Sequence, residues 1–598
     1  MKIIKYIKKV FIFLFLFIVV FTTSSCDLIS KIDPGDFNDY SARLLKTLLG
    51  NDELTLHFLF NDKEALGITD TKVSLPTPGT TSALGKLIIN LYFGPMKNYN
   101  YEELNFDEKM TYNVIVDLLD RINKKTSDMA YLDNNYLGSY LGYQAQLPIL
   151  LQQYRFNNLD DVHNYFELLK LVPETFETYY NYEVEKSEKG FGMPDYVIDK
   201  VVDQCVEFVN DKEEHFLITT FPQRIAKFNL TEQEEYSLIE ENKNIIQNTV
   251  CSGYEYIRDN LPNLKGKATN NLGLCYYKTT LSDGTVYELG KEYYEYLFTR
   301  ATGYEVEMED AIAYMQLHLD NIISEIKDIK ERRPNINEEI ENIQLMNDDV
   351  YAQMEIYKNL IINDFPTIEE YPTISILNVD PALEDHFSPA AYVSSPIDDY
   401  SHEAIYLNQK KINGDMNYLY TTLAHEGIPG HMYQNIFFKG QDVNLIRKVL
   451  KNSGYQEGWA TYVELYMYDF VEDLDEDILL YMKDYDILNG VLTARLDMGI
   501  HYQGWDENDI YDYLSQYFGG YDNERCVRIL QQLAEVPTNS QSYYYTYFKL
   551  CDMRERVMNA LGDNYDPIAF HKLILDCGPL PLRFVEVVVD EYIASFGN

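Results

Sequence analysis

The chain has 598 residues and a large excess of acidic side chains, which gives it a formal net charge of −45. A surface of this charge repels the phosphates of nucleic acids and of anionic membranes, so no nucleic-acid partner is expected. No Gly-, Ser- or Pro-rich linker divides the sequence, which favours one large body over a string of domains.

Residues 1–26 are typical of a lipoprotein signal peptide. Four lysines precede an apolar run, Val10 to Phe21, that is too short to span a membrane easily, and small residues then lead to Cys26. We expect lipidation of Cys26, which would anchor the exported protein to the outer face of the cell membrane, at the cell surface or in the periplasm. Simple secretion or an uncleaved anchor are alternatives, because Thr23 is an imperfect residue three positions before the cysteine.

Residues 27–36 are expected to form a short tether, and residues 37–370 an N-terminal helical region. Apolar residues recur there at three- and four-residue spacing, as in YLGYQAQLPILLQQY and DAIAYMQLHLDNIISEIKDIKERR, which is the period of amphipathic helices. Six further cysteines, either paired or buried as thiols, show no metal-type spacing. Sulfur is therefore not expected to hold a metal.

Residues 371–598 are predicted to be the metal-site region, with strands, metal helices and C-terminal helices in chain order. Residues 373–408 are rich in β-branched and aromatic residues between Pro and Asp, which predicts a small group of strands. Residues 415–470 would form the zinc helices. We expect this region and the N-terminal region to be one continuous, mainly α structural unit.

The segment YLYTTLAHEGIPGHMYQNIFF carries the chemistry, with His425, Glu426 and His431. Two imidazoles can bind Zn²⁺, and a carboxylate beside the first can take a proton from the attacking water. The histidines are six residues apart, which on a straight helix separates them by about 120°. Because Pro429 and Gly430 lie between them, we expect a local break that turns both imidazoles into one cleft.

A third ligand is expected in the following segment, GYQEGWATYVELY. Glu457 and Glu464 are seven residues apart and share one helical face. We favour Glu457 as the ligand and Glu464 as the group that orients a ligating histidine, although Glu464 could equally belong to a helical ion pair or a solvated face.

HEGIPGHMYQ and EGWATYVE together resemble a bacterial family catalogued as domain of unknown function 885, with the pattern HExxPGHxxQ then EGWAxYxE and members often assigned as lipoproteins. The likeness continues through residues 494–514 and 569–586. It implies a large helical body of the zincin-like metallopeptidase type, with His425, His431 and Glu457 as ligands and Glu426 as base. Where the family shows PGQAxSYxxG this chain has PTNSQSYYYT, with Thr546 at the Gly position.

Peptide hydrolysis also needs a donor to the developing oxyanion, for which Tyr543 and His501 are the candidates. Arg495 and Arg554 could bind a substrate carboxylate. For each of these four residues ordinary packing or ion pairing is the alternative, since the chain has 53 tyrosines and abundant acids.

The sequence thus predicts an exported zinc-dependent hydrolase, a metallopeptidase with peptide substrates. The alternatives are a lipoprotein that binds peptides or cations without chemistry, a metal-binding pseudoenzyme, and a zinc amidase acting on a non-peptide or cell-wall amide. The oligomeric state is not predicted.

Overall fold

The computed structural model describes residues 35–79, 83–133, 136–280, 283–341, 343–346, 349–379, 381, 384, 387–412, 416–472 and 474–596. The predicted signal peptide, Cys26 and nearly all of the tether lie outside these residues. Among the described helices, none combines the length and the apolar character needed to cross a membrane.

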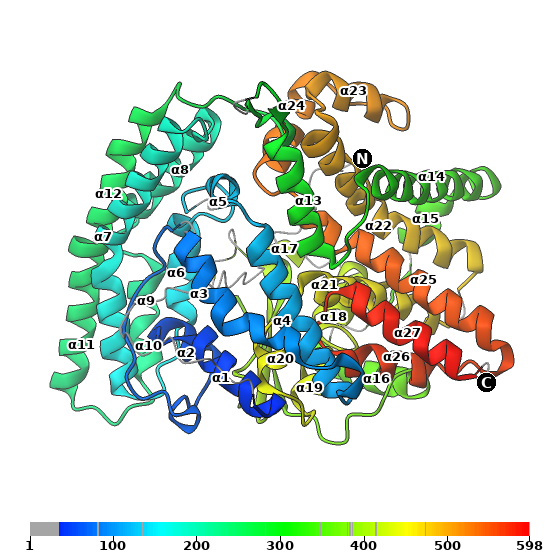
Figure 1. Ribbon diagram of the computed structural model, residues 1–598, viewed down its shortest axis with the longest axis horizontal. Helices are drawn as coiled ribbons and strands as arrows, with labels where there is room; N and C mark the ends of the chain where they lie inside the picture. The colour runs from blue at the N-terminus through cyan, green and yellow to red at the C-terminus, as the bar shows by residue number, and fades with distance from the viewer. Residues whose placement is uncertain are drawn as a thin grey trace.

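The N-terminal helices fall into two groups, each with its own core. The first group is α1 (Phe37–Leu49), α2 (Glu53–Leu59), α3 (Ala83–Phe93) and α4 (Phe106–Lys124). The short α5 (Ser127–Asp133) follows it and contributes Met129 and Tyr131 to other cores. The second group is α6 (Tyr143–Gln153), α7 (Leu159–Glu188), α8 (Asp195–Asn210), α9 (Phe216–Thr219), α10 (Phe221–Ile225), α11 (Glu232–Asn244) and α12 (Cys251–Asn260). In the second group α7, α8 and α12 pack together along one side of the molecule (Figure 1).

The third and largest core is built from helices on both sides of residue 370. The helices before that residue are α13 (Leu289–Thr302), α14 (Met308–Arg332), α15 (Ile336–Glu341) and α16 (Val350–Leu360). Those near the C-terminus are α22 (Glu476–Met498), α23 (Glu507–Ser515), α24 (Asn523–Ala534), α25 (Tyr544–Leu561), α26 (Pro567–Cys577) and α27 (Leu582–Phe596). A single hydrophobic core thus joins segments from before and after residue 370.

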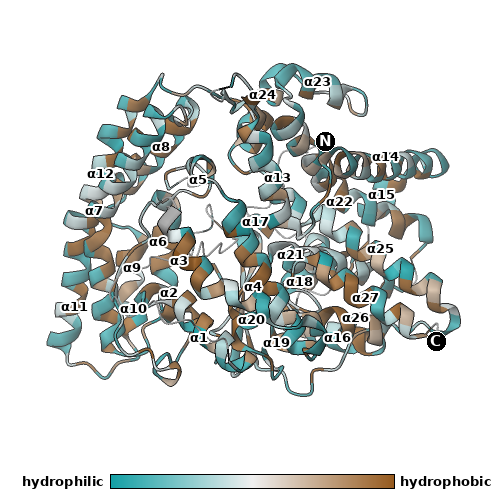
Figure 2. Ribbon diagram, in the orientation of Figure 1, coloured by the Kyte–Doolittle hydropathy of each residue, from teal (hydrophilic) through white to brown (hydrophobic). Residues whose placement is uncertain are grey.

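The outer helices have the amphipathic character that the sequence pattern predicted. Figure 2 shows hydrophilic and hydrophobic residues interleaved along α7, α11 and α14. In α14, for example, Met315, Leu319 and Ile322 are buried at three- and four-residue spacing, while Leu317 lies between them and is exposed. Such a stripe buries apolar surface without removing the charged face from water.

A three-stranded sheet precedes the metal helices, as predicted, and the mainly helical fold with a small β element is confirmed. The strands are β3 (Thr373–Asn378), β4 (Ala390–Val393) and β5 (His402–Leu407), in the order β3-β5-β4. β5 pairs in parallel with β3 and antiparallel with β4, so β4 is an edge strand. A hairpin of β1 (Thr279–Thr280) and β2 (Val286–Tyr287) was not predicted.

The metal helices follow the sheet. They are α18 (Met416–Glu426), α19 (His431–Lys439), α20 (Leu445–Val449) and α21 (Ser453–Tyr466), and a short α17 (Gln409–Ile412) precedes them. All residues of α21 except Ser453 and Gln456 are buried. A helix buried on nearly every side lies in the centre of its domain and has little freedom to shift.

Two glycines allow neighbouring chain segments to approach α21 closely. A Cβ on Gly458 would lie 2.5 Å from Thr546 Oγ1 on α25, and one on Gly454 would lie 2.5 Å from the carbonyl oxygen of Ala301 on α13. Real contacts this short do not occur, so both positions require glycine.

Gly458→Ala is expected to destabilise the protein. The overlap with Thr546 costs about 1–3 kcal/mol as for other overpacked cores, and the helix propensity of Ala offsets up to about 1 kcal/mol. Gly519→Ala is the matched control, because nothing lies within 4 Å of its Cβ position. Urea denaturation should give a lower midpoint for Gly458→Ala alone, and equal midpoints for the two variants would contradict the close packing.

Candidate metal centre

The helix carrying His425 ends at Glu426, and a new helix begins at His431. A Cβ on Gly430 would lie 1.9 Å from the carbonyl oxygen of His425, so only glycine lets the chain turn back against the end of α18. The Ile428–Pro429 peptide bond is cis. The predicted break between the two histidines is therefore present.

Contacts from neighbouring segments hold this turn in place. The Tyr433 backbone N–H donates to the carbonyl oxygen of Gly427 at 3.1 Å. The indole Nε1 of Trp459, which is fully buried on α21, donates to the carbonyl oxygen of Pro429 at 2.9 Å. The turn is thus attached to the central helix, the same helix that supplies the carboxylates.

His425, His431 and Glu457 converge. The two imidazole ring centroids are 4.8 Å apart, with the ring planes at 89°. One carboxylate oxygen of Glu457, Oε2, lies 3.7 Å from His425 Nε2 and 3.3 Å from His431 Nε2. One candidate ligand atom from each side chain can be chosen so that all three lie within 4.8 Å of one another.

Glu464 makes the contact predicted for it. Its Oε2 lies 2.8 Å from His425 Nδ1. With the proton on Nδ1, the ring donates to this carboxylate and carries its lone pair on Nε2, the atom that faces Glu457. Glu457 and Glu464 are two turns apart on α21, which places both carboxylates on the same side of the helix. The pairing fixes the ring orientation of His425.

The electrostatics of the cluster fit a cation. Burial alone would raise the pKa of Glu457, but the adjacent His431 and His425 outweigh it and hold that pKa well below its ordinary value. Oε2 of Glu457 is buried and makes no hydrogen bond of normal geometry. Two imidazole nitrogens and one carboxylate oxygen form a donor set suited to zinc.

Glu426 and Tyr543 lie beside the three candidate ligands. Oε2 of Glu426 accepts a hydrogen bond of 2.9 Å from the backbone N–H of Tyr392 on β4. The Tyr543 ring stacks on His425 with centroids 6.3 Å apart. Burial raises the pKa of the Tyr543 hydroxyl well above its ordinary value, and the charges of Glu457 and Glu426 add to the increase. The hydroxyl thus remains protonated and able to donate.

Thr546, at the position where the family pattern has glycine, lies in the first turn of α25. Its Oγ1 donates to the carbonyl oxygen of Ser542 at 2.6 Å and lies against Gly458. The loop before it contains Thr538, at a positive φ of 62°. The threonine side chain is therefore accommodated by a hydrogen bond within its own helix and by the absence of a side chain on Gly458.

His501 occupies a structural position instead. Its Nδ1 accepts from the backbone N–H of Leu274 at 3.2 Å, and its Nε2 lies 3.0 Å from the carbonyl oxygen of Leu533. The ring is fully buried and stacks on Tyr294. With both nitrogens engaged by backbone groups, His501 fits the alternative of a core histidine rather than an oxyanion donor.

The two arginines also make structural contacts. Arg495 donates from Nε to Gln316 Oε1 at 2.9 Å and lies over the Trp505 ring at 4.6 Å. Arg554, on α25, lies over the Tyr466 ring at 4.7 Å. These contacts do not place either guanidinium with the histidine cluster, so packing is the reading that the structure favours for both.

Two contributors were missed by sequence reasoning. Tyr392 takes part through its backbone N–H, which no residue pattern could reveal. Trp459 lies within the EGWATYVE motif, so its position beside Glu457 could have indicated that it supports the site.

Fold and site together define a mainly helical protein whose central helix presents a His-His-Glu cluster suited to a metal ion. The chain belongs to the family described as "Bacterial protein of unknown function (DUF885)", whose model matches residues 65–589. The sequence resemblance is thereby confirmed. No match was found among curated proteins.

Two solved structures share the fold. A protein from Colwellia psychrerythraea, assigned as a lipoprotein, is 15% identical with a TM-score of 0.77, over 94% of this chain and 98% of that one. A lipoprotein of unknown function from Shewanella oneidensis is 16% identical with a TM-score of 0.62, over 92% and 99%. A Bacillus anthracis protein assigned as an oligoendopeptidase F is 12% identical, over 90% and 97%, and its TM-score of 0.31 is too low to support a conclusion.

Glu464→Ala is expected to weaken zinc binding about 10-fold to 100-fold, because His425 would lose the partner that orients it. Competition with a fluorescent chelator measures the affinity. His425→Ala serves as the reference for loss of a ligand and should abolish stoichiometric binding. Unchanged affinity in Glu464→Ala would show that the carboxylate does not orient the ligand, and full zinc occupancy in His425→Ala would remove the site.

Proposed function

We propose that this protein is an extracytoplasmic zinc-dependent hydrolase, a metallopeptidase that cleaves peptide bonds. The observation that carries the proposal is the convergence of His425, His431 and Glu457 with a second carboxylate, Glu426, next to them. Three protein ligands with an open position are typical of catalytic rather than structural zinc sites. The assignment of two structural relatives as lipoproteins supports export and anchoring through Cys26.

His425, His431 and Glu457 would hold the ion, and Glu464 keeps His425 in the required tautomer. When bound, zinc would polarise the attacking water and the substrate carbonyl and offset the negative charge that develops in the transition state. Glu426 accepts the proton of the attacking water and delivers it to the leaving amine. The Tyr392 N–H holds one Glu426 oxygen, so the other remains available for the proton.

Tyr543 is the residue placed to stabilise the oxyanion. Its hydroxyl is buried without a hydrogen bond of normal geometry, and it lies next to the ligands on an ordered turn. A preorganised donor in a site from which water is excluded stabilises developing charge more than the same donor in water does.

The edge strand β4 supports a peptide as substrate. Because the Tyr392 N–H donates to Glu426, it does not point toward β5, and the backbone groups of Tyr392 face the open edge of the sheet. An extended peptide paired with this edge would pass the base and the metal cluster. The same residues would serve a zinc amidase, and a lipoprotein that binds peptides or cations is the alternative without chemistry.

Glu426→Gln is expected to retain zinc and to lose about 100-fold to 10,000-fold in kcat, because the amide cannot accept the proton. A peptide library digested by wild type and variant, followed by mass spectrometry, measures turnover, and elemental analysis measures zinc. Cleavage by wild type should stop with a chelator and return with zinc. A Gln variant as active as wild type would exclude Glu426 as the base, and a wild type that cleaves no peptide would favour the amidase or the binding protein.

Tyr543→Phe is expected to lower kcat about 100-fold with little change in KM or zinc content, since it removes a donor used only in the transition state. Tyr544→Phe is the neighbouring control, because the Tyr544 ring packs against Gly490 on α22. Steady-state kinetics on one peptide found by the library digest measures both. An unchanged kcat in the Tyr543→Phe enzyme would show that the Tyr543 hydroxyl does not stabilise the oxyanion.

A further inference from the structure

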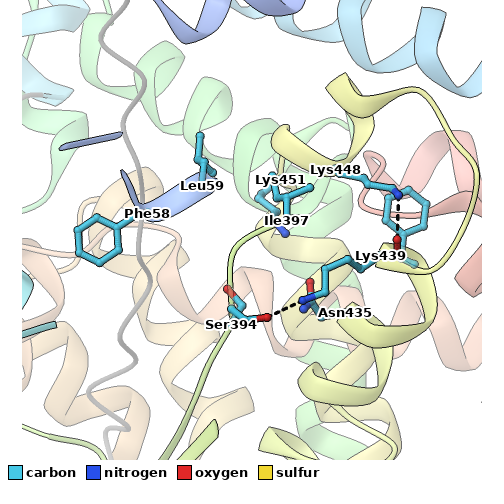
Figure 3. Close-up of a pocket in the computed structure, with 10 residues that line it drawn as sticks. Phe58, Leu59, Ser394, Ile397, Asn435, Lys439, Lys448 and Lys451 are labelled. Atoms are coloured by element: carbon cyan, nitrogen blue, oxygen red, sulfur yellow. Dashed lines mark hydrogen bonds between the residues drawn. The ribbon is translucent and has the colours of Figure 1, made fainter. Parts of the chain in front are cut away.

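A basic pocket lies at the far end of α19 from His431. Its cavity has a volume of about 50 Å³, enough for a small polar group but not for a whole side chain and its neighbours. Polar side chains that line it are Ser394, Ser395, Asn435, Lys439, Lys448 and Lys451 (Figure 3). Three lysines around one cavity are unusual in a chain whose net charge is −45.

One of the three lysine charges is neutralised by the protein. Lys439 Nζ lies 2.6 Å from Glu403 Oε1 and donates to Ser395 Oγ at 2.6 Å, and both charged side chains are buried. Glu403 is further held by the hydroxyl of Tyr392 at 2.8 Å. Lys439 thus lines the pocket with its charge already paired to a carboxylate inside the protein.

The other two lysines form no close ion pair within the described part of the chain, although Asp442 and Asp107 lie near Lys448 and Glu403 lies near Lys451. Lys448 Nζ donates to the backbone carbonyl of Lys439 at 2.8 Å, and no ion pair joins Lys448 or Lys451 to an acid there. Lysines but no carboxylates line the cavity, and this arrangement attracts an anion.

Lys451 lines the pocket beside apolar side chains. Its side chain keeps exposed surface. Nevertheless, desolvation by surrounding protein, with the charge of Lys439 second, lowers the pKa of Lys451 to about 8. The apolar side chains of Phe58, Leu59 and Ile397 form the rest of the wall and strengthen charge interactions inside it.

The pocket is linked to the metal centre through α19 and β4. Asn435 is one helical turn beyond His431 and Lys439 is two turns beyond, about 12 Å along the axis. Asn435 donates to the Tyr392 hydroxyl at 2.7 Å, and the Tyr392 backbone holds Glu426. The chain continues from β4 directly into Ser394 and Ser395. A peptide extended along β4 would therefore reach the pocket about three or four residues from the reacting bond.

We propose that this pocket binds a carboxylate of the substrate, as an acidic side chain or a terminal carboxylate, three or four residues from the bond that is cleaved. The assignment rests on the proposed peptidase function. Lys448 and Lys451 supply the charges, and the hydroxyls of Ser394 and Ser395 and the amide of Asn435 line the same cavity. The substrates would then be peptides with an acidic group at one fixed distance.

Binding is tested apart from turnover with zinc-loaded Glu426→Gln protein and fluorescent peptides that differ only in a Glu or a Gln at successive positions. Fluorescence anisotropy should show about tenfold or greater preference for Glu at one position, as for a hydrogen-bonded charge. A parallel set with free or amidated C-termini distinguishes the two sources of the carboxylate. Equal affinity for all acidic and neutral partners in both sets would overturn the proposal.

The pocket is then removed with Lys448→Met and Lys451→Met together. The preference should fall to less than twofold, while neutral peptides bind as before and circular dichroism shows an unchanged fold. Lys227→Met is the matched control, because Lys227 is exposed, has no carboxylate partner among the described residues and lies in the second core group. If the preference for acidic peptides survives the double variant, or if Lys227→Met also removes it, the pocket is not its source.

Failure of this inference and failure of the proposed function give different results. Wild-type enzyme that cleaves peptides without regard to acidic groups would retain the function and remove the pocket. Protein that binds acidic peptides through the two lysines and cleaves none would retain the pocket and remove the peptidase.

Discussion

Two imidazoles from one sequence segment must face a single carboxylate, and a continuous helix with their six-residue spacing cannot achieve this. The chain meets the requirement by ending α18 at Glu426 and starting α19 at His431, with Gly430 packed against the carbonyl oxygen of His425. The break places Glu426, the proposed base, at the last residue of one helix and His431, a proposed ligand, at the first residue of the next. Every other feature of the site depends on this turn.

The central helix α21 makes the turn specific. It supplies Glu457 between the imidazoles, Glu464 behind His425 and the Trp459 indole on the Pro429 carbonyl. Since one buried helix carries all three, their mutual positions do not depend on loops. Gly454 and Gly458 let α13 and α25 pack directly on it, and α25 begins immediately after Tyr543. Rigid support of this kind is what holds ligating and donor groups at working distances.

Sequence patterns predicted the features of the site that depend on residues within one segment or one helix. The helical period, the Pro-Gly break and the seven-residue spacing of Glu457 and Glu464 all follow from geometry within a segment. The role of His501 could not be judged in the same way, because its partners Leu274 and Leu533 are far away in sequence. The contribution of Tyr392 was also hidden, since a backbone N–H leaves no trace in residue identity. The lysines of the pocket come from α19, α20 and the segment before α21, and only the fold brings them together.

The distribution of charge explains how a protein with a large negative net charge could bind a carboxylate. At physiological ionic strength, interactions between exposed charges are largely screened beyond about 8 Å, so the net charge of −45 acts weakly on a bound group. Inside the pocket the apolar wall and the side chains of Lys448 and Lys451 dominate the local potential. An acidic peptide would thus meet little long-range repulsion, and the pocket would hold its carboxylate by contacts at short range. Discrimination would then arise from contacts made only in the correct register along β4, since elsewhere the same carboxylate meets an acidic surface.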